Sequence, residues 1–214
     1  GALLQYLYDT QKTDLEHFTH IYPYLTSKYM LLDSSTRRNL ELTETLREKQ
    51  KRGSLLWVLD KTKTAMGARL LRNYIEQPLI EKDEMDAIQE LNQDSISRDE
   101  IREYLNPIYD LERLLSKVTY KTANPRDLIA FRNSLQMLPP IKTVLSAFEK
   151  EELTEIREQI DGLEDIYQLI DEAIIDEPPL SIREGGMIKD QFDETIDHLR
   201  AAKHDGKQWL VQLE

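Results

Sequence analysis

Two histidines near the start of the chain are spaced to bind a metal ion. His17 and His20 are three residues apart, so both imidazoles would lie on one face of a helix, and imidazole nitrogens are frequent zinc ligands. The nearest further ligands are Asp14 and Glu16, and the absence of cysteine rules out a thiolate zinc site and a disulfide. Histidines at a helix–loop junction are far more often ordinary surface residues. We therefore expect no metal site.

Neighbouring carboxylates are the second set of side chains that could do chemistry. Paired acids catalyse glycoside hydrolysis or proton transfer when an apolar pocket raises the pKa of one of them. The pairs Glu151-Glu152 and Asp171-Glu172 instead fall on the polar sides of amphipathic helical patterns, where both groups would be solvated. A hydrolase with an acidic site remains an alternative that rests on the abundance of carboxylates alone.

Motifs that bind nucleotides or activate a serine are missing from the sequence. It contains no G-x-x-x-x-G-K-[ST] loop, no G-x-G-x-x-G and no G-x-S-x-G, and Gly185-Gly186 alone is too short to surround a phosphate. We expect no catalytic, cofactor-binding or metal site in this chain, and we do not expect it to be an enzyme.

The charge of the chain argues against a surface that follows nucleic-acid phosphates. Its 40 acidic residues outnumber its 28 Lys and Arg residues, for a net charge of −12, whereas such surfaces are usually basic. The densest basic cluster is 47–52, which we interpret as the solvated end of a helix; an isolated nucleic-acid contact there is the alternative. No apolar run approaches the roughly 18 residues that a membrane span requires.

Helix start signals recur along the chain and predict a mainly helical fold. Short polar residues that can accept a hydrogen bond from the first turn precede apolar residues spaced three or four apart. The expected N-cap residues are Asp33, Ser54, Thr64, Ser97 and Asn124. We expect the first of these helices to run from Ser34 to about Lys51, where Gly53 ends it.

Other elements follow from apolar spacing and from prolines. A helix near 83–92 should bury Met85, Ile88 and Leu91, and a helix should cover 1–12. Pro178-Pro179 is a clear break, after which 180–183 should be extended and Gly185-Gly186 should form a turn with positive φ. One or two short strands are expected within 21–32.

The final helical pattern is a heptad seam that needs a partner helix. Its members are four, three, four, three, four and three residues apart: Phe192, Ile196, Leu199, Lys203, Gly206, Leu210 and Leu213. The pattern reaches Glu214 without a stop signal, and we infer that the natural chain continues; an ordinary C-terminal helix is the alternative.

Seven segments, in order and in spacing, resemble the MutS family of DNA mismatch-repair proteins. These segments are Asp33–Leu42, Ser54–Asp60, Thr64–Leu79, Asp110–Arg113, Thr122–Leu128, Leu138-Pro139 and Ile182–Gly186. The start, Gly1–Leu7, resembles the bacterial branch in particular. The resemblance covers essentially the whole chain.

The resemblance implies a part of the parent protein that holds no active site. It points to the helical core and the start of the lever: an entry segment over 1–32, a helical core over 33–182 and the beginning of a long lever helix over 183–214. The ATPase with its ATP and Mg, the DNA clamp and the mismatch-reading F-x-E motif lie elsewhere in such proteins. Phe192-Asp193-Glu194 has the F-x-E letters, but it lies in the lever region, and we interpret it as a coincidence.

Residues that match the family motifs have structural interpretations here. They are Thr36, Arg37, Asn39, Glu41, Gly67, Arg69, Leu70, Pro78, Arg126, Gly185 and Gly186. We expect Thr36 and Asn39 to fix the entry of a helix through backbone hydrogen bonds. Gly67 should allow another helix to approach closely, and Arg37, Arg69 and Arg126 should join helices by pairing with Asp or Glu.

The predicted function is a helical relay that couples the ATPase state of a cytoplasmic mismatch sensor to its grip on DNA. The partners implied by the resemblance are mismatched duplex DNA, a second copy of the parent and a downstream repair factor, with no membrane. A general adaptor that binds a partner's helix along a groove is the alternative, since it would explain the open seam equally well.

Overall fold

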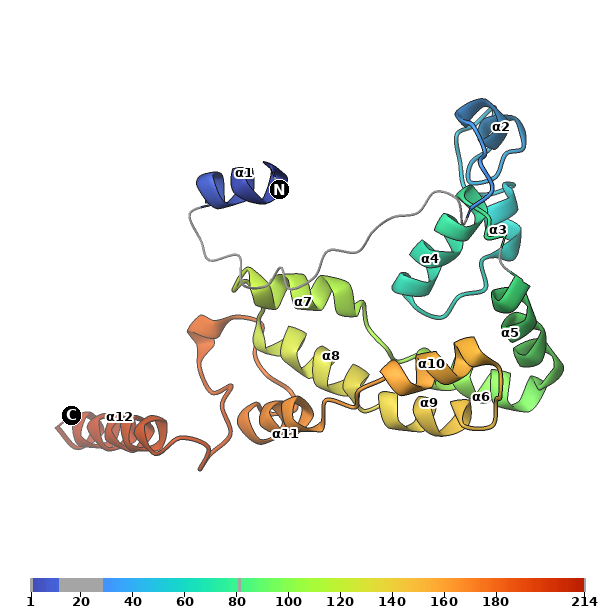
Figure 1. Cartoon of the computed structure of the whole chain (residues 1–214). Helices are drawn as coiled ribbons and strands as arrows, with labels where there is room; N and C mark the ends of the chain where they lie inside the picture. Colours follow the sequence, from blue (N-terminus) through green and yellow to red (C-terminus); the bar gives the residue numbers. More distant parts are fainter. Residues whose placement is uncertain (1, 12–28, 81, 214) are drawn as a thin grey trace.

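The computed structural model describes residues 2–11, 29–80 and 82–213, and these residues are mainly helical (Figure 1). The helices are α1 Ala2–Gln11, α2 Ser34–Asn39, α3 Leu55–Leu59, α4 Ala65–Glu76, α5 Lys82–Gln93, α6 Ser95–Leu105, α7 Leu111–Thr119, α8 Pro125–Leu135, α9 Leu138–Leu145, α10 Glu151–Gln159, α11 Glu164–Ala173 and α12 Glu194–Leu213. A short 3-10 helix covers Ile182–Glu184. In the described part of the chain, extended pairing is limited to isolated bridges, so the predicted mainly α fold class is confirmed.

Three small apolar clusters hold these helices together. Leu42, Leu56 and Ile75 form the first, within an arm made of α2, α3 and α4. The second lies among α5, α6, α9 and α10 and includes Ile141 and Phe148. The third packs α7 and α8 against α11 around the following residues: Leu114, Ile129, Phe131, Leu135, Ile170, Ala173 and Ile174. In Figure 1 the arm projects from one end of the row α5–α11 and α12 extends from the other.

Most predicted N-caps are present. Asp33, Ser54 and Thr64 each accept a hydrogen bond from a backbone N–H three residues later. Asn124 begins α8 with a full capping box, in which the carboxylate of Asp127 accepts from the Asn124 N–H at 3.0 Å. The exception is α6, which is capped by Asp94, three residues before the expected Ser97. Asp94 accepts from both the N–H and the hydroxyl of Ser97, so Ser97 lies inside the helix.

The predicted helix from Ser34 to about Lys51 is wrong beyond its first turns, because α2 ends at Asn39. Glu41 takes a left-handed conformation with φ of 48°, and its carboxylate accepts a 2.6 Å hydrogen bond from the Leu46 N–H. The bend turns Leu42 into the first apolar cluster. Burial of that leucine outweighs the helix propensity of the segment that follows, which forms a loop up to Ser54.

Three smaller predictions also differ from the structure. Met85 and Ile88 are exposed on α5, and Ala87 is the buried residue of that helix, because α6 and α10 pack on the side of α5 that carries the smaller residue. Residues 180–183 are not simply extended, since a Ser181–Glu184 capping box closes a 3-10 turn. Within 29–32 there is one isolated bridge, from Tyr29 to Leu79, and 21–28 lie outside the described residues.

Candidate functional site

Arg69 joins two elements that are far apart in sequence. From α4, its guanidinium donates two 2.8 Å hydrogen bonds to the Asp110 carboxylate and one of 2.5 Å to Glu112. Asp110 also caps α7 by accepting from the Arg113 N–H. We call this group the Arg69 bridge. It connects the α2–α4 arm to α7, as the expected pairing of Arg69 with acids requires.

Electrostatics stabilises the charged forms in the Arg69 bridge. The Arg69 guanidinium lowers the pKa of Asp110, and partial burial of that carboxylate acts in the opposite direction. In the other direction, Asp110 and then Glu112 raise the pKa of Arg69. A carboxylate with a depressed pKa stays ionised at neutral pH and is a poor proton donor. The group therefore suits a structural connection better than acid–base catalysis.

A second arginine joins α8 to the end of α11. The Arg132 side chain is only 12% exposed, and it donates 2.8 Å hydrogen bonds to both Asp171 and Asp176. Its guanidinium lowers the pKa of Asp176. We call this group the Arg132 bridge, and it fixes the chain where α11 ends and the Pro178-Pro179 break begins.

A third arginine attaches α12 to the same region. Arg200 donates 2.6 Å hydrogen bonds to the Asp190 carboxylate and to the Ile188 carbonyl oxygen. The segment containing Ile188 pairs in turn with the end of α11, since the Lys189 N–H donates to the Ala173 carbonyl at 2.8 Å. This Arg200 bridge links α12 to the end of α11 through hydrogen bonds, in addition to the covalent connection along the chain.

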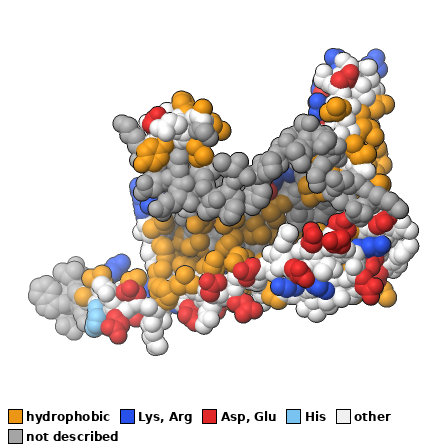
Figure 2. All heavy atoms as spheres, in the orientation of Figure 1, with side chains coloured by type: hydrophobic (Ala, Val, Ile, Leu, Met, Phe, Trp, Pro, Cys, Tyr) orange, Lys and Arg blue, Asp and Glu red, His pale blue; other side chains and the backbone are white. Residues whose placement is uncertain are grey.

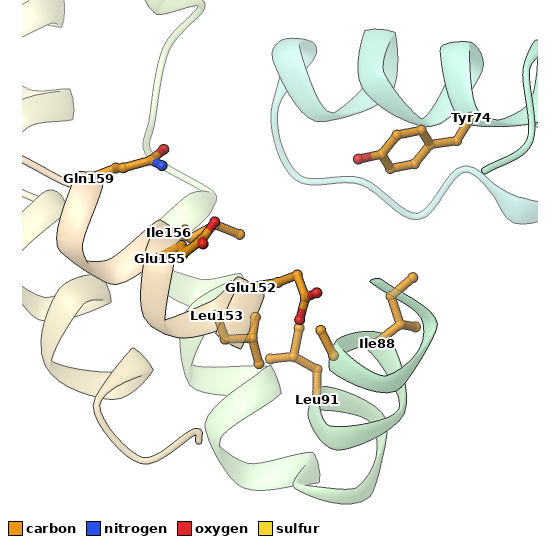
Figure 3. A pocket seen from close by; sticks show the side chains of 9 residues that line it. Tyr74, Ile88, Leu91, Glu152, Leu153, Glu155, Ile156 and Gln159 are labelled. Carbon is orange, nitrogen blue, oxygen red and sulfur yellow. The ribbon is translucent and has the colours of Figure 1, made fainter. Parts of the chain in front are cut away.

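An apolar groove lies between α5 and α10, with Tyr74 of α4 facing it (Figure 3). It has a volume of about 340 Å³, and Leu91 and Leu153 contribute to its apolar lining, as Figure 3 shows. Glu152 and Glu155 also line it. Elsewhere on α5, Glu90 accepts hydrogen bonds from the Glu149 and Lys150 N–H groups, at 3.2 and 3.1 Å, and so holds the segment that enters α10.

The motif-matching residues occupy structural positions, but not always the predicted ones. The backbone N–H of Thr36 donates to Asp33 at 2.6 Å, which fixes the start of α2. Arg126 donates to the carbonyl of Pro178 at 2.9 Å and so joins α8 to the break through backbone, not through an acid. Arg37 makes no ion pair within the described residues; hydrogen bonds from Thr36 lower the pKa of Asp33, and the charge of Arg37 adds a smaller effect in the same direction.

The glycine predictions divide in the same way. A Cβ on Gly67 would meet the Thr64 hydroxyl at 3.0 Å and Thr62, so this glycine makes room for the cap of its own helix and not for another helix. Gly185 and Gly186 both have φ of +72°, as predicted. Three further motif positions lie at or near the surface of the arm: Asn39, Leu70 and Pro78.

Arg132, Arg200 and Glu90 were not singled out from the sequence. Their partners are as far as 44, 12 and 60 residues away, and no local spacing signals such a contact. His17 and His20 lie outside the described residues. The described part of the chain contains no cluster of three potential metal ligands, and no helix there is long and apolar enough to cross a membrane.

Comparison with known proteins bears on this arrangement. A family model, MutS domain III, matches residues 35–212. This chain belongs to the MutS domain III family. The DNA mismatch repair protein MutS of Lachnoclostridium phytofermentans is 64% identical over 218 residues, covering all of this chain and 23% of that protein. MutS of Ruminiclostridium cellulolyticum is 52% identical and that of Acetivibrio thermocellus 49%, each with all of this chain and 25% of the relative covered.

The chain thus spans about a quarter of the length of the curated MutS relatives that it matches. Within MutS domain III, the bridges of Arg69, Arg132 and Arg200 connect the arm, the central helices and α12 in series. These three bridges form the candidate functional site, and their hydrogen bonds hold helices in position.

Proposed function

We propose that this segment is a non-catalytic helical relay in an ATP-dependent MutS protein, where it couples the nucleotide state to the grip on DNA. The observation that carries the proposal is the series of three arginine bridges. The Arg69 and Arg132 bridges join elements about 40 residues apart, and the Arg200 bridge joins α12 to the segment that pairs with the end of α11, so a displacement of the arm can reach α12 through these contacts. Coupling over such distances needs elements with discrete arrangements that both sites bias.

The candidate hinges are Pro178-Pro179 and Gly185-Gly186, which lie between the Arg132 and Arg200 bridges. Proline restricts φ, whereas glycine tolerates the positive φ seen at both glycines. Backbone pairing of residues 173–175 with 187–189 closes the loop that contains both pairs, so α12 changes direction at these hinges only when that pairing opens.

The rest of the proposal concerns the parent protein. It would bind mismatched duplex DNA, ATP and Mg through regions other than this segment, act in the cytoplasm as a homodimer, and engage a downstream repair factor. The isolated chain should not hydrolyse ATP, and it should bind duplex DNA weakly without preferring a mismatch.

The test is a measurement of coupling in a full-length MutS that carries this segment. In the Arg132→Met and Arg200→Met variants, the Kd for a mismatched duplex is measured with and without ATP. The ratio of the two values should fall several-fold toward one, since allosteric couplings are typically 5- to 150-fold. ATP hydrolysis without DNA should not change.

Arg157→Met is a matched control, because among the described residues the one ion pair of Arg157 is with its neighbour Glu158, at 4.0 Å, and does not reach a second helix. A wild-type ratio in both bridge variants would overturn the relay. Mismatch-dependent binding by the isolated chain would overturn it as well.

The alternative function, a helix-binding adaptor, has one specific observation in its favour. The α5–α10 groove exposes Ile88 (61%) and Ile156 (49%) beside Glu152 and Glu155, which would suit a basic amphipathic helix. Ile88→Asp should then abolish capture of such a helix and leave ATP-dependent DNA release by the full-length protein unchanged. The relay alone predicts that the groove captures no such helix, so Ile88→Asp should change neither helix capture nor ATP-dependent DNA release.

A further inference from the structure

The short helix α3 presents an exposed apolar surface. Of its five residues only Leu56 is buried, at 4% exposure, while Val58 is 56% exposed and Trp57 is 49% exposed. Leu55 and Leu59 are also exposed. We call the side chains of Leu55, Trp57, Val58 and Leu59 the α3 surface. Figure 2 shows hydrophobic side chains along the outer edge of the arm that carries α2 and α3.

The loop that leads into α3 is basic, and we call its residues Arg47 and Arg52 the basic rim. The loop between α2 and α3 is held to the start of α3, because the N–H groups of Leu55 and Leu56 donate to carbonyls of that loop. Arg47 and Arg52 on the loop are exposed and make no ion pair in the described part of the chain, whereas Lys49 pairs with Glu44 and Lys51 with Asp60. Figure 2 shows Lys and Arg side chains at the tip of the arm.

The local charge is opposite to that of the rest of the chain. Residues 33–63 contain eight Lys or Arg and five Asp or Glu, a net charge of +3; the whole chain carries −12, so the remaining residues carry −15. A rim of this sign attracts an acidic surface.

The composition of the surface favours a protein partner over a nucleic acid. Interfaces with nucleic acids are polar and strongly basic throughout. Protein interfaces combine an apolar centre with a polar rim, and they are enriched in Trp and Arg. Trp57 and its aliphatic neighbours on α3, with Arg47 and Arg52 on the loop that leads into this helix, match the second description.

We propose that the α3 surface and its basic rim dock against an apolar, acid-rimmed surface in the part of the MutS polypeptide that lies outside this segment. Two observations select this occupant: the charge of the rim, and the relatives' length, of which this chain spans about a quarter. The inference rests on the proposed function only in placing the segment inside a longer MutS protein.

Cysteine labelling tests the docking, since the chain has no cysteine of its own. Val58→Cys is made in this chain and in a cysteine-free full-length MutS that contains it, and the rate of maleimide labelling is measured without nucleotide. Labelling should be at least about tenfold slower in the full-length protein, where the site reacts only on local opening. Equal rates would overturn the proposal.

Ile96→Cys on α6 is the matched control, because Ile96 is 80% exposed and lies outside the α3 surface. It should label at the same rate in both proteins, and an equal slowing of both cysteines would contradict the docking. Adding Arg47→Glu and Arg52→Glu should speed the labelling of residue 58 in the full-length protein, whereas Lys203→Glu should not.

Two further labelling experiments test whether DNA or a second copy of the chain covers the α3 surface instead. If duplex DNA slows the labelling of the isolated chain, the surface binds nucleic acid and the proposal fails. If the rate falls as the chain concentration rises, a second copy covers the surface and the proposal fails too. Failure of the ATP-coupling test leaves these labelling results unaffected, so the two proposals are judged separately.

Discussion

The Arg69 guanidinium on α4 grips the Asp110 carboxylate before α7 through two parallel hydrogen bonds, each of 2.8 Å. The same carboxylate caps α7, so one residue both begins a helix and holds the arm against it. A planar guanidinium can make this two-point contact, whereas an ammonium group cannot. Loss of either partner should therefore loosen the arm and leave the central helices folded.

The free energy of unfolding should fall at acid pH, because carboxyls such as Asp110 have lowered pKa values in the folded chain. The folded-state pKa of Asp110 is lowered by Arg69, and that of Asp60 is lowered to about 2 by Lys51 and Thr62. When the pKa of a carboxyl is lower in the folded than in the unfolded state, its ionised form stabilises the fold. This contribution is fully present above the pKa of the unfolded state, about 3.9, and is lost as the pH falls through the pKa of the folded state. Urea unfolding between pH 7 and pH 2 should show the free energy of unfolding falling below about pH 4.

Replacing Arg69 by Met should reduce the acid-sensitive part of this stability, since Asp110 then loses the partner that lowers its pKa. Arg72→Met is the control, because in the part of the chain that the structure describes Arg72 forms an ion pair with Glu76 of its own helix and with no other acid. An unchanged pH profile in Arg69→Met would show that the bridge does not form in solution.

Arg132→Met should destabilise the packing of α8 on α11. The Arg132 side chain is mostly buried, and its removal takes the guanidinium partner from Asp171 and Asp176; both acids are partly exposed, so water offsets some of the loss. We expect a loss of about 2 kcal/mol in the free energy of unfolding. Chemical denaturation measures it, and Arg157→Met should change stability by far less.

Ser134→Ala should leave the Tyr109 N–H without its hydrogen-bond acceptor. Ser134 is fully buried; its hydroxyl donates to the Ala130 carbonyl and accepts from the Tyr109 N–H at 3.0 Å. The cost should be about 1–3 kcal/mol. Amide exchange of Tyr109 should become faster. Ser116→Ala, which removes an exposed hydroxyl bonded within its own helix, should have little effect.

Gly185→Ala should lower the free energy of unfolding by about 1–3 kcal/mol through backbone strain alone. Its φ of 72° and ψ of −173° are open essentially to glycine only, yet an added Cβ would meet nothing within 4 Å. Gly162→Ala is the matched control, since a Cβ there would make only ordinary contacts of 3.7 Å or more at a φ that is not positive. Equal thermal unfolding of the two variants would contradict the strain.

Glu90→Ala should weaken the start of α10. The α10 N-cap Lys150 makes no side-chain capping hydrogen bond, and Glu90 on α5 holds the entry to α10 by accepting from the Glu149 and Lys150 N–H groups. The loss of a cap costs about 1 kcal/mol. Native-state hydrogen exchange should show faster exchange at Glu149 and Lys150, whereas Glu155→Ala should leave both amides unchanged.

Local chemistry made much of this fold predictable from the sequence. The caps at Asp33, Ser54, Thr64 and Asn124 depend on side chains that reach only three residues along the chain, and the Gly185-Gly186 turn depends on its own backbone. Such signals are complete within a few residues, so their spacing suffices to predict them.

Tertiary structure decided what depends on distant partners. The helix beginning at Ser34 ends early because Leu42 is buried with Leu56 and Ile75, and Ala87 is buried instead of Met85 because of what packs on α5. The partners of Arg69, Arg132 and Glu90 lie about 40 to 60 residues away. A free-energy gain from contacts between remote segments leaves no local pattern, so the sequence determined where most of the capped helices begin, and packing decided where the helix at Ser34 ends and what the buried and bridging charges bind.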